Sequence, residues 1–430
     1  MEQVVAVGTQ FMREVNAGAV LRRLRAETGT SMSVSALAKA VGLSRQAVTR
    51  SLNALAAEGL VEFGPLDRDS TRAGRPAQLV RFRAEAGHVL GLSVSPQALR
   101  VAVADLAGTV TAADAVLLGD RGGDLSGEEV VRTLLAAVGR TLAAAGVAAG
   151  GLWFASVGAP GIIDPAAGVV RLLPSMPGLV GDLLVRRLTE ALSCPVYLDN
   201  DVKLATQGER WRGAERHENS MVMVHWGERV GAGIVLNGEL YRGASNDAGD
   251  VGFLDVFAAG TDPAPSTDPR PGGPRHPHGL GPFEERVGGQ EIVRLATAAS
   301  ATHGDDALRD RIEAAGERAL DAVLDAFADG APAALEAIDV VAGRFARGVA
   351  AIRAILDPQI VIIGGPLARC GEPLLTAVRR HLSDQPLDQP ALEISALRDD
   401  AVVHGALRHS LDEIERTRFD LVRSGRPEPR

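Results

Sequence analysis

Residues 42–62, GLSRQAVTRSLNALAAEGLVE, constrain the fold of this chain more than any other stretch. Ser44 is a good helix N-cap, because its hydroxyl can accept a hydrogen bond from the unpaired amides of a first helical turn. Behind it the helical repeat separates a small or apolar face (Ala47, Val48, Ser51, Leu52 and Leu55) from a polar face (Arg45, Gln46, Thr49, Arg50 and Asn53). Arg, Gln and Asn side chains can pair bidentately with base edges. The polar face, together with Ser44, is therefore predicted to contact DNA.

The flanking segments complete a winged helix-turn-helix pattern. Residues 33–41 read as a shorter capped helix, and Gly42-Leu43 form a tight turn before the next helix. Residues 12–28 read as a preceding helix, and 60–66 and 77–84 as the two strands of a β-hairpin wing. The alternative interpretation is a solvated surface helix in an ordinary α-helical domain.

Between the wing strands, Gly74-Arg75-Pro76 marks a further DNA-binding candidate. Proline fixes its own φ and favours extended geometry at the residue before it. An exposed, extended Arg75 suits a minor groove or a phosphate, although it could equally be a solvated loop arginine. Residues 1–87 carry 12 basic and 8 acidic residues, a net +4, whereas the remainder carries 33 and 46, a net −13. This asymmetry fits a nucleic-acid module joined to a body that does not touch DNA.

Composition limits the class of protein. An apolar fraction of 46% with 23% charged residues is typical of a globular chain, and 430 residues allow two or three domains. Two cysteines, Cys194 and Cys370, are too few for a disulfide framework or a structural zinc site. The chain opens with no secretory signal pattern and contains no uninterrupted apolar run of membrane-spanning length. We therefore expect a cytoplasmic protein with no membrane partner.

From residue 88 the pattern becomes α/β. Strand hairpins followed by helices and further strands occur twice, which predicts two lobes of similar build. The expected domains are a DNA-binding head (1–87), lobe I (88–200, with a C-terminal helix at about 399–416 packed back on it), lobe II (201–398) and a disordered tail (417–430).

One segment of lobe II departs from this pattern. Residues 259–283 hold seven prolines and five glycines and predict a mobile surface loop. Its His276 and His278, without further ligands, make a poor metal site.

In these features the chain resembles the ROK family (repressors, open reading frames and sugar kinases), specifically its transcriptional regulators. In the head the resemblance rests on residues 42–62 and Gly74-Arg75-Pro76. In the body it rests on GAPGIID (158–164), YLDND (197–201), VGAGIVLNGELYRGA (230–244), AGDVGF (248–253) and IVIIGGPLA (360–368). The resemblance implies a winged helix-turn-helix followed by a two-lobed sugar-kinase/actin-like (RNase H-like) body. It also implies a homodimer, a sugar or sugar derivative bound between the lobes, and control of carbohydrate genes through a double-stranded DNA operator.

The resemblance also implies ligand-binding residues. Asn200 and Asp201 match the family pair that grips sugar hydroxyls, which is sound chemistry for a carboxylate. The alternative is that residues 199–201 only cap the helix that begins at Val202. The other ligand-binding residues implied are Gly158, Asp250 and Glu284.

Two departures from the family pattern concern its zinc site. Phe253 replaces the family histidine that contacts sugar or zinc, and the loop that would hold the cysteine-rich zinc knuckle contains no cysteine. We therefore expect no zinc and no other cofactor.

Two further departures concern catalysis. Ser93 and Ser95 stand where kinase members carry the aspartate and glycine of the first phosphate loop, so the metal loses its anchor and the phosphate its close approach. Glu228 precedes the second phosphate loop and would repel a polyphosphate. We therefore expect a regulator, most commonly a repressor in this family, that has lost phosphoryl transfer. The alternatives are an active sugar kinase with an appended DNA-binding head, and a ligand-blind regulator whose body serves only for dimerisation.

Overall fold

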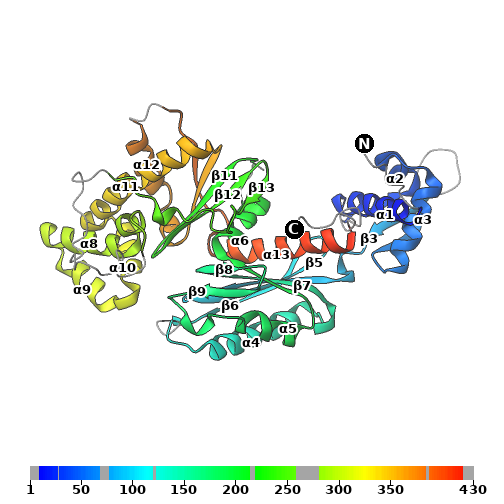
Figure 1. Ribbon diagram of the computed structural model, residues 1–430, viewed down its shortest axis with the longest axis horizontal. Coiled ribbons are helices and arrows are strands. Elements are labelled where there is room, and N and C mark those ends of the chain that lie inside the picture. The colour runs from blue at the N-terminus through cyan, green and yellow to red at the C-terminus, as the bar shows by residue number, and fades with distance from the viewer. Residues whose placement is uncertain are drawn as a thin grey trace.

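Three helices and a three-stranded sheet form the N-terminal head (Figure 1). The computed structural model describes residues 9–27, 29–67, 77–119, 123–213, 218–257, 280–383 and 387–419. The elements of the head are α1 (Thr9–Ala26), β1 (Met32–Ser33), α2 (Val34–Val41), α3 (Arg45–Ala57), β2 (Val61–Asp67) and β3 (Ala77–Phe82). The strand order is β1-β3-β2, antiparallel throughout. The predicted winged helix-turn-helix is confirmed.

Capping residues set the ends of the two helices of this motif. The Oγ of Ser33 accepts from the amide of Ala36 at 3.2 Å and begins α2. Gly42, with φ of 67°, ends that helix in the left-handed conformation that glycine adopts without strain. Two residues later the Oγ of Ser44 accepts from the amide of Ala47 at 3.2 Å and begins α3. The short turn therefore fixes the angle at which α3 leaves α2.

Lobe I is a five-stranded mixed sheet covered on one face by two helices. Its elements are β4 (His88–Val94), β5 (Ala98–Asp105), β6 (Val110–Leu117), α4 (Gly127–Ala145), β7 (Leu152–Ala159), α5 (Leu183–Leu192) and β10 (Val196–Asn200), with a small hairpin of β8 (Ile162–Asp164) and β9 (Val169–Leu172). The strand order is β10-β7-β4-β5-β6. Strands β4, β5 and β6 form an antiparallel meander, and β7 and β10 continue the sheet in parallel.

Lobe II repeats this plan. Its strands are β11 (Met221–Trp226), β12 (Val230–Leu236), β13 (Glu239–Tyr241), β14 (Ile360–Gly364) and β15 (Ala391–Ile394). Its helices are α7 (Glu284–Val287), α8 (Gly289–His303), α9 (Asp306–Ala315), α10 (Ala319–Ala328), α11 (Pro332–Leu356) and α12 (Gly371–Leu382). The strand order is β13-β12-β11-β14-β15, with two antiparallel pairs followed by two parallel pairs. Lobe I has the same succession when its sheet is read from β6 to β10. The predicted duplication, and with it the actin-like fold class, is confirmed.

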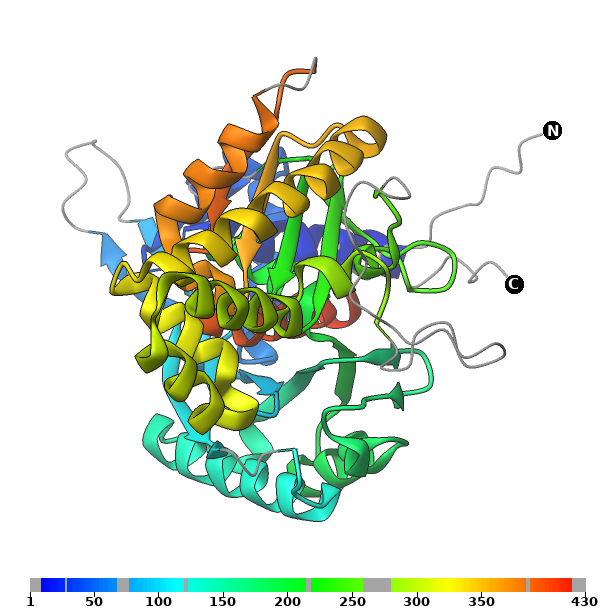
Figure 2. The same cartoon turned by 90° about the vertical axis from the view of Figure 1, so that its left-hand side faces the viewer.

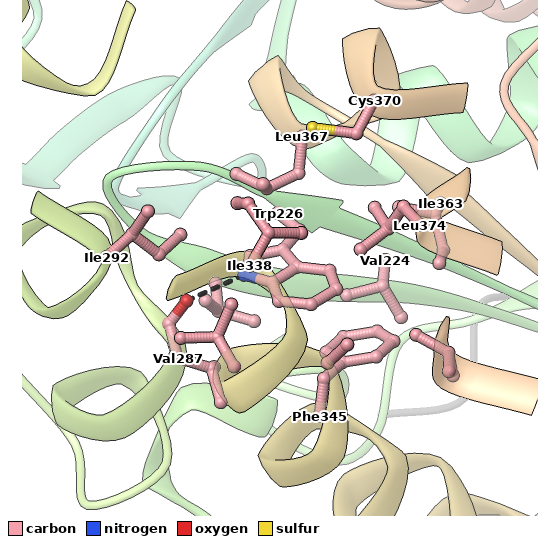
Figure 3. Packing of buried hydrophobic residues seen from close by; sticks show 14 of the residues in the cluster. Val224, Trp226, Val287, Ile292, Ile338, Phe345, Ile363, Leu367, Cys370 and Leu374 are labelled. Carbon is pink, nitrogen blue, oxygen red and sulfur yellow. Dashed lines mark hydrogen bonds between the residues drawn. The ribbon is translucent and has the colours of Figure 1, made fainter. Parts of the chain in front are cut away.

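The core of lobe II is built around an aromatic pair. Trp226 stacks on Phe345 with ring centroids 3.9 Å apart, among aliphatic side chains from the sheet and its covering helices (Figure 3). The indole N–H of Trp226 donates to the carbonyl of Val287 at 2.7 Å, so its burial leaves no polar atom unpaired. This contact fixes α7 and the start of α8 against the end of β11.

Two helices lie between the lobes, α6 (Asp201–Gly208) and α13 (Ala401–Ile414) (Figures 1 and 2). The backbones of the two helices approach closely at two glycines. A Cβ placed on Gly405 would lie 1.7 Å from the carbonyl oxygen of Leu204, and one on Gly208 would lie 2.2 Å from that of Ala401. Helix α13 also packs along β4 and β7 of lobe I, so the C-terminal segment is part of the body and not an appendage.

The head shares its core with the body. One continuous cluster of buried apolar side chains includes Leu24 of α1, Leu106 after β5 and Leu407 of α13. At its edge Arg25 donates to the carbonyl of Leu106 at 3.2 Å and pairs with Glu415 at 3.0 Å. The head is therefore seated on lobe I and on the C-terminal helix. No helix in the described part of the chain is both long and apolar enough to cross a membrane.

Candidate functional sites

The outer face of α3 has the geometry of a DNA-reading surface. Its inner face is closed, with Val48 and Leu52 fully buried. All five polar residues predicted to contact DNA, Arg45, Gln46, Thr49, Arg50 and Asn53, are exposed on the opposite face, and the capping Ser44 is exposed beside them. The hydroxyl of Thr49 donates to the carbonyl of Arg45 at 2.9 Å.

The two arginines on this face, Arg45 and Arg50, form no ion pair with the described residues. By contrast, Arg81 of the wing is paired with Glu62 and Glu85. Unpaired guanidinium groups on an exposed helix face are available to phosphates and to guanine edges. Arg75 lies outside the described residues.

A small pocket lies between the lobes. Its lining comes from lobe I and α6 (Gly161, Ile162, Ile163, Asn200, Val202 and Lys203) and from lobe II (Gly231, Ala232 and Asn246 to Asp250). Its volume of about 50 Å³ is small beside the roughly 300 Å³ or more of typical ligand pockets. Of the five residues that the sequence predicts to bind a ligand, Asn200 and Asp250 line this pocket.

Asn200 and Asp201 lie at the end of β10, where the strand leads directly into α6. The Oδ1 of Asn200 accepts from the amides of Val202 and Lys203 at 3.0 and 3.2 Å, and its Nδ2 donates to the carbonyl of Gly161 at 3.1 Å. Asn200 is therefore the N-cap of α6 and also lines the pocket. Burial raises the pKa of Asp201, and nearby His225 opposes that shift. Ligand contact by both residues remains a prediction.

Asp250 and Lys203 complete the polar lining of the pocket. Asp250 is exposed at the pocket, and desolvation together with Asp247 raises the pKa of its carboxyl group. Lys203 is 6% exposed, and its ammonium donates to the backbone carbonyl of Asn246. Sequence reasoning did not select Lys203, although lysine occurs only twice in the chain.

Asp201 and the two remaining candidate residues, Gly158 and Glu284, lie outside the pocket lining. A Cβ on Gly158 would lie 2.4 Å from a methyl group of Val402, so the close packing of α13 accounts for this glycine. Glu284 is buried and accepts from the amide of Val230 at 2.8 Å and from Arg229 at 3.0 Å. These contacts hold the turn before β12 in place without a ligand.

The residues at the expected phosphate-loop positions, Ser93, Ser95 and Glu228, make contacts within the protein. The hydroxyl of Ser95 donates to the carbonyl of Ala98 and accepts from its amide, at 3.0 and 3.1 Å, so it closes the β4–β5 turn. Ser93 is buried within β4. The carboxylate of Glu228 lies beside Gly289 at the start of α8, where an added Cβ would come within 2.5 Å of its Oε2.

A buried polar chain connects the pocket side of lobe II to α13. Arg242 pairs with fully buried Asp199 at 2.6 Å, and the hydroxyl of Tyr197 donates to the same carboxylate at 3.1 Å. The Tyr197 ring stacks on His409 at 3.8 Å between centroids, and the Nδ1 of His409 is 3.0 Å from the hydroxyl of Ser156. Burial raises the pKa of Tyr197 and lowers that of His409 to about 4, so both groups are neutral at pH 7.

The described residues contain no group of three or more His, Cys, Asp or Glu side chains that could hold a metal ion. Phe253 is 61% exposed at the end of a short 3₁₀ turn. His276 and His278 belong to residues outside the description. Cys194 and Cys370 are buried free thiols, and burial raises their pKa values to about 11 and about 12.

Comparisons with known proteins agree with this arrangement. Residues 89–412 match the model of the ROK family, and residues 15–70 match that of the MarR family. A putative xylose repressor from Caldicellulosiruptor sp. (strain Rt8B.4) is 24% identical over 393 residues, covering 88% of this chain and 91% of that protein. A glucokinase from Halalkalibacterium halodurans is 29% identical over 254 residues, covering 58% of this chain and 73% of the enzyme.

Solved structures show the same fold. A ROK family transcriptional regulator, described as a homolog of the E. coli MLC protein, superposes with a TM-score of 0.68 at 20% identity, covering 95% of this chain and 99% of its own. A ROK family glucokinase from Streptomyces griseus superposes with a TM-score of 0.60 at 20% identity. The glucokinase is covered completely but matches only 76% of this chain. The regulator, in contrast, matches nearly the full length of this chain.

Proposed function

Because this chain belongs to the ROK family, we propose that it is a DNA-binding transcriptional repressor of carbohydrate genes, with a kinase-like body that senses a sugar or sugar derivative. The observation that carries the proposal is the structure of α3, an N-capped helix with an apolar face that is buried and a polar face that is exposed. The arginines of the polar face form no ion pair with any residue that the structure describes. Two such heads in a homodimer would read half-sites about one helical turn of DNA apart, or a multiple of it.

The altered phosphate loops support a regulator against an active kinase. Ser93 and Ser95 supply neither a metal-binding carboxylate nor a glycine, and Glu228 places an acid at the second loop. The similarity to glucokinases keeps an active kinase as the alternative. Incubation with ATP and a hexose panel separates the two, because an active kinase produces ADP in proportion to the matching sugar and the proposed regulator does not.

The direct test is DNA binding by the full-length protein. Fluorescence anisotropy with DNA from upstream of its own gene, set against a scrambled duplex, should show specific and salt-dependent affinity. Repeating the titration with monosaccharides, sugar phosphates and amino sugars should change that affinity for one compound. Binding that no compound alters would favour a body that serves only for dimerisation. Equal affinity for the scrambled duplex would contradict the proposal.

Arg50→Ala should weaken binding to the specific duplex by roughly 1–3 kcal/mol and binding to the scrambled duplex by less, if Arg50 pairs with a base. The matched control is Arg50→Lys, which retains the charge but loses the two-pronged donor geometry. A base contact predicts that Arg50→Lys behaves like Arg50→Ala on the specific duplex. A phosphate contact predicts that Arg50→Lys behaves like the parent protein, and that outcome would remove Arg50 from the base-reading set.

A further inference from the structure

The pocket between the lobes encloses a buried cation, Lys203, that forms no ion pair with any of the described residues. The ammonium of Lys203 donates to the neutral backbone carbonyl of Asn246. Asp199, Asp250 and Asp247 attract the ammonium electrostatically without pairing with it, and Asp199, which has the largest effect, is already paired with Arg242 at 2.6 Å. A buried charge without an ionic partner is unfavourable. A ligand that supplies a negative charge would remove this cost.

We propose that this pocket takes an anionic carbohydrate, a sugar that carries a carboxylate or a phosphate group, and that Lys203 pairs with that group. The inference rests on the proposed function, because it names the class of effector for the same pocket. An ammonium has three N–H donors, and the carbonyl of Asn246 takes one. The other two can form charge-assisted hydrogen bonds to the oxygens of an anion, which are the stronger kind.

The remaining lining fits the rest of such a ligand. A volume of about 50 Å³ can enclose one small group, with the sugar ring towards solvent. There the exposed carboxylates of Asp247 and Asp250 can accept from hydroxyl groups. A protonated amino sugar would place a second positive charge beside Lys203. Burial lowers the pKa of Lys203, and a bound anion would raise it again.

Isothermal titration calorimetry on the full-length protein tests the charge preference. The probes are glucose, galactose and mannose, each with its 2-amino derivative, its uronate and its 6-phosphate, so that the ring is constant within a series. We expect the uronate or the 6-phosphate of at least one ring to bind roughly tenfold or more tightly than the neutral parent. Which of the two binds identifies the anion. Anionic members that bind no better than their parents in all three series would overturn the proposal.

A matched pair of variants assigns the effect to one side chain. Lys203→Met should abolish the preference for the anionic probe. Lys39→Met, at the only other lysine in the chain and exposed on α2, should leave it unchanged. An anionic preference that survives in Lys203→Met would overturn the assignment. If Lys203→Met does not fold, amine labelling of the Lys39→Met protein is followed by mass spectrometry on the peptide that contains Lys203, because the N-terminal amine also reacts. The anionic probe must slow the labelling of that peptide while its neutral parent does not.

Parallel anisotropy measurements on the upstream DNA separate this inference from the proposed function. Specific DNA binding without any anionic preference would overturn only the ligand class. Loss of DNA specificity, with anionic binding that depends on Lys203, would overturn only the repressor.

Discussion

Gly405→Ala should destabilise the protein by roughly 3 kcal/mol, the upper part of the usual range for overpacking a close contact. The added Cβ would lie 1.7 Å from the carbonyl oxygen of Leu204, and the obstructing atom belongs to the backbone of α6. A backbone atom cannot rotate away as a side chain can. Helices α6 and α13 must separate, and their separation disturbs both lobes together. Urea denaturation followed by circular dichroism measures the effect.

Gly139→Ala is the matched control. Gly139 is also inside a helix, on the exposed face of α4, and a Cβ there would meet no atom within 4 Å. Alanine has a higher helix propensity than glycine, so this variant should be more stable by up to about 1 kcal/mol. Opposite signs for the two substitutions would demonstrate that the α6–α13 contact requires glycine. Similar small effects at both positions would show that the helices can move apart without penalty.

His409 should make the protein less stable in mild acid. The pKa of the folded-state imidazole is about 4 because of burial, whereas an unfolded histidine has a pKa of about 6.5. Between these values the unfolded chain binds a proton that the folded protein does not. The contribution of His409 to stability is therefore complete above pH 6.5 and is lost as the pH falls to 4. The difference corresponds to about 3 kcal/mol.

The free energy of unfolding, measured at several pH values between 7 and 4, checks this expectation. His409→Gln should flatten the decline, although it loses the stacking on Tyr197 at every pH. His303→Gln is the control, because His303 is partly exposed and pairs with Glu336 on the surface. His88 and His404, whose pKa values burial also lowers, account for part of the decline that remains. An unchanged slope in His409→Gln would contradict the assignment.

Local patterns explain why much of the fold could be predicted. The caps at Ser33 and Ser44 and the periodicity of residues 45–57 are properties of a few neighbouring residues, and the structure reproduces them. The duplicated lobes could be predicted because each lobe begins with a strand hairpin that is followed by helices and further strands. The role of Ser95 in closing the β4–β5 turn, by contrast, follows only from the geometry.

The pocket depends on contacts that no local pattern encodes. Lys203 meets Asn246, and Arg242 meets Asp199, only because the two lobes approach each other. Glu284 contacts Val230 across 54 positions of the chain, so its burial could not be seen from its neighbours. Asn200 illustrates both cases. The sequence offers a capping role and a ligand-binding role for it, and the structure shows that it caps α6 while it also lines the pocket.

The continuous core beneath the head has an evolutionary consequence. Recombination can exchange DNA-binding modules between regulators when a flexible linker is the only connection between them. Here Leu24 of the head packs in one cluster with Leu106 and Leu407, which are far apart in the chain. A transplanted head would leave these body residues exposed unless it carried a complementary surface. The specificity of this protein for DNA should therefore diverge by substitution on the outer face of α3, while the surface beneath the head evolves together with lobe I and α13.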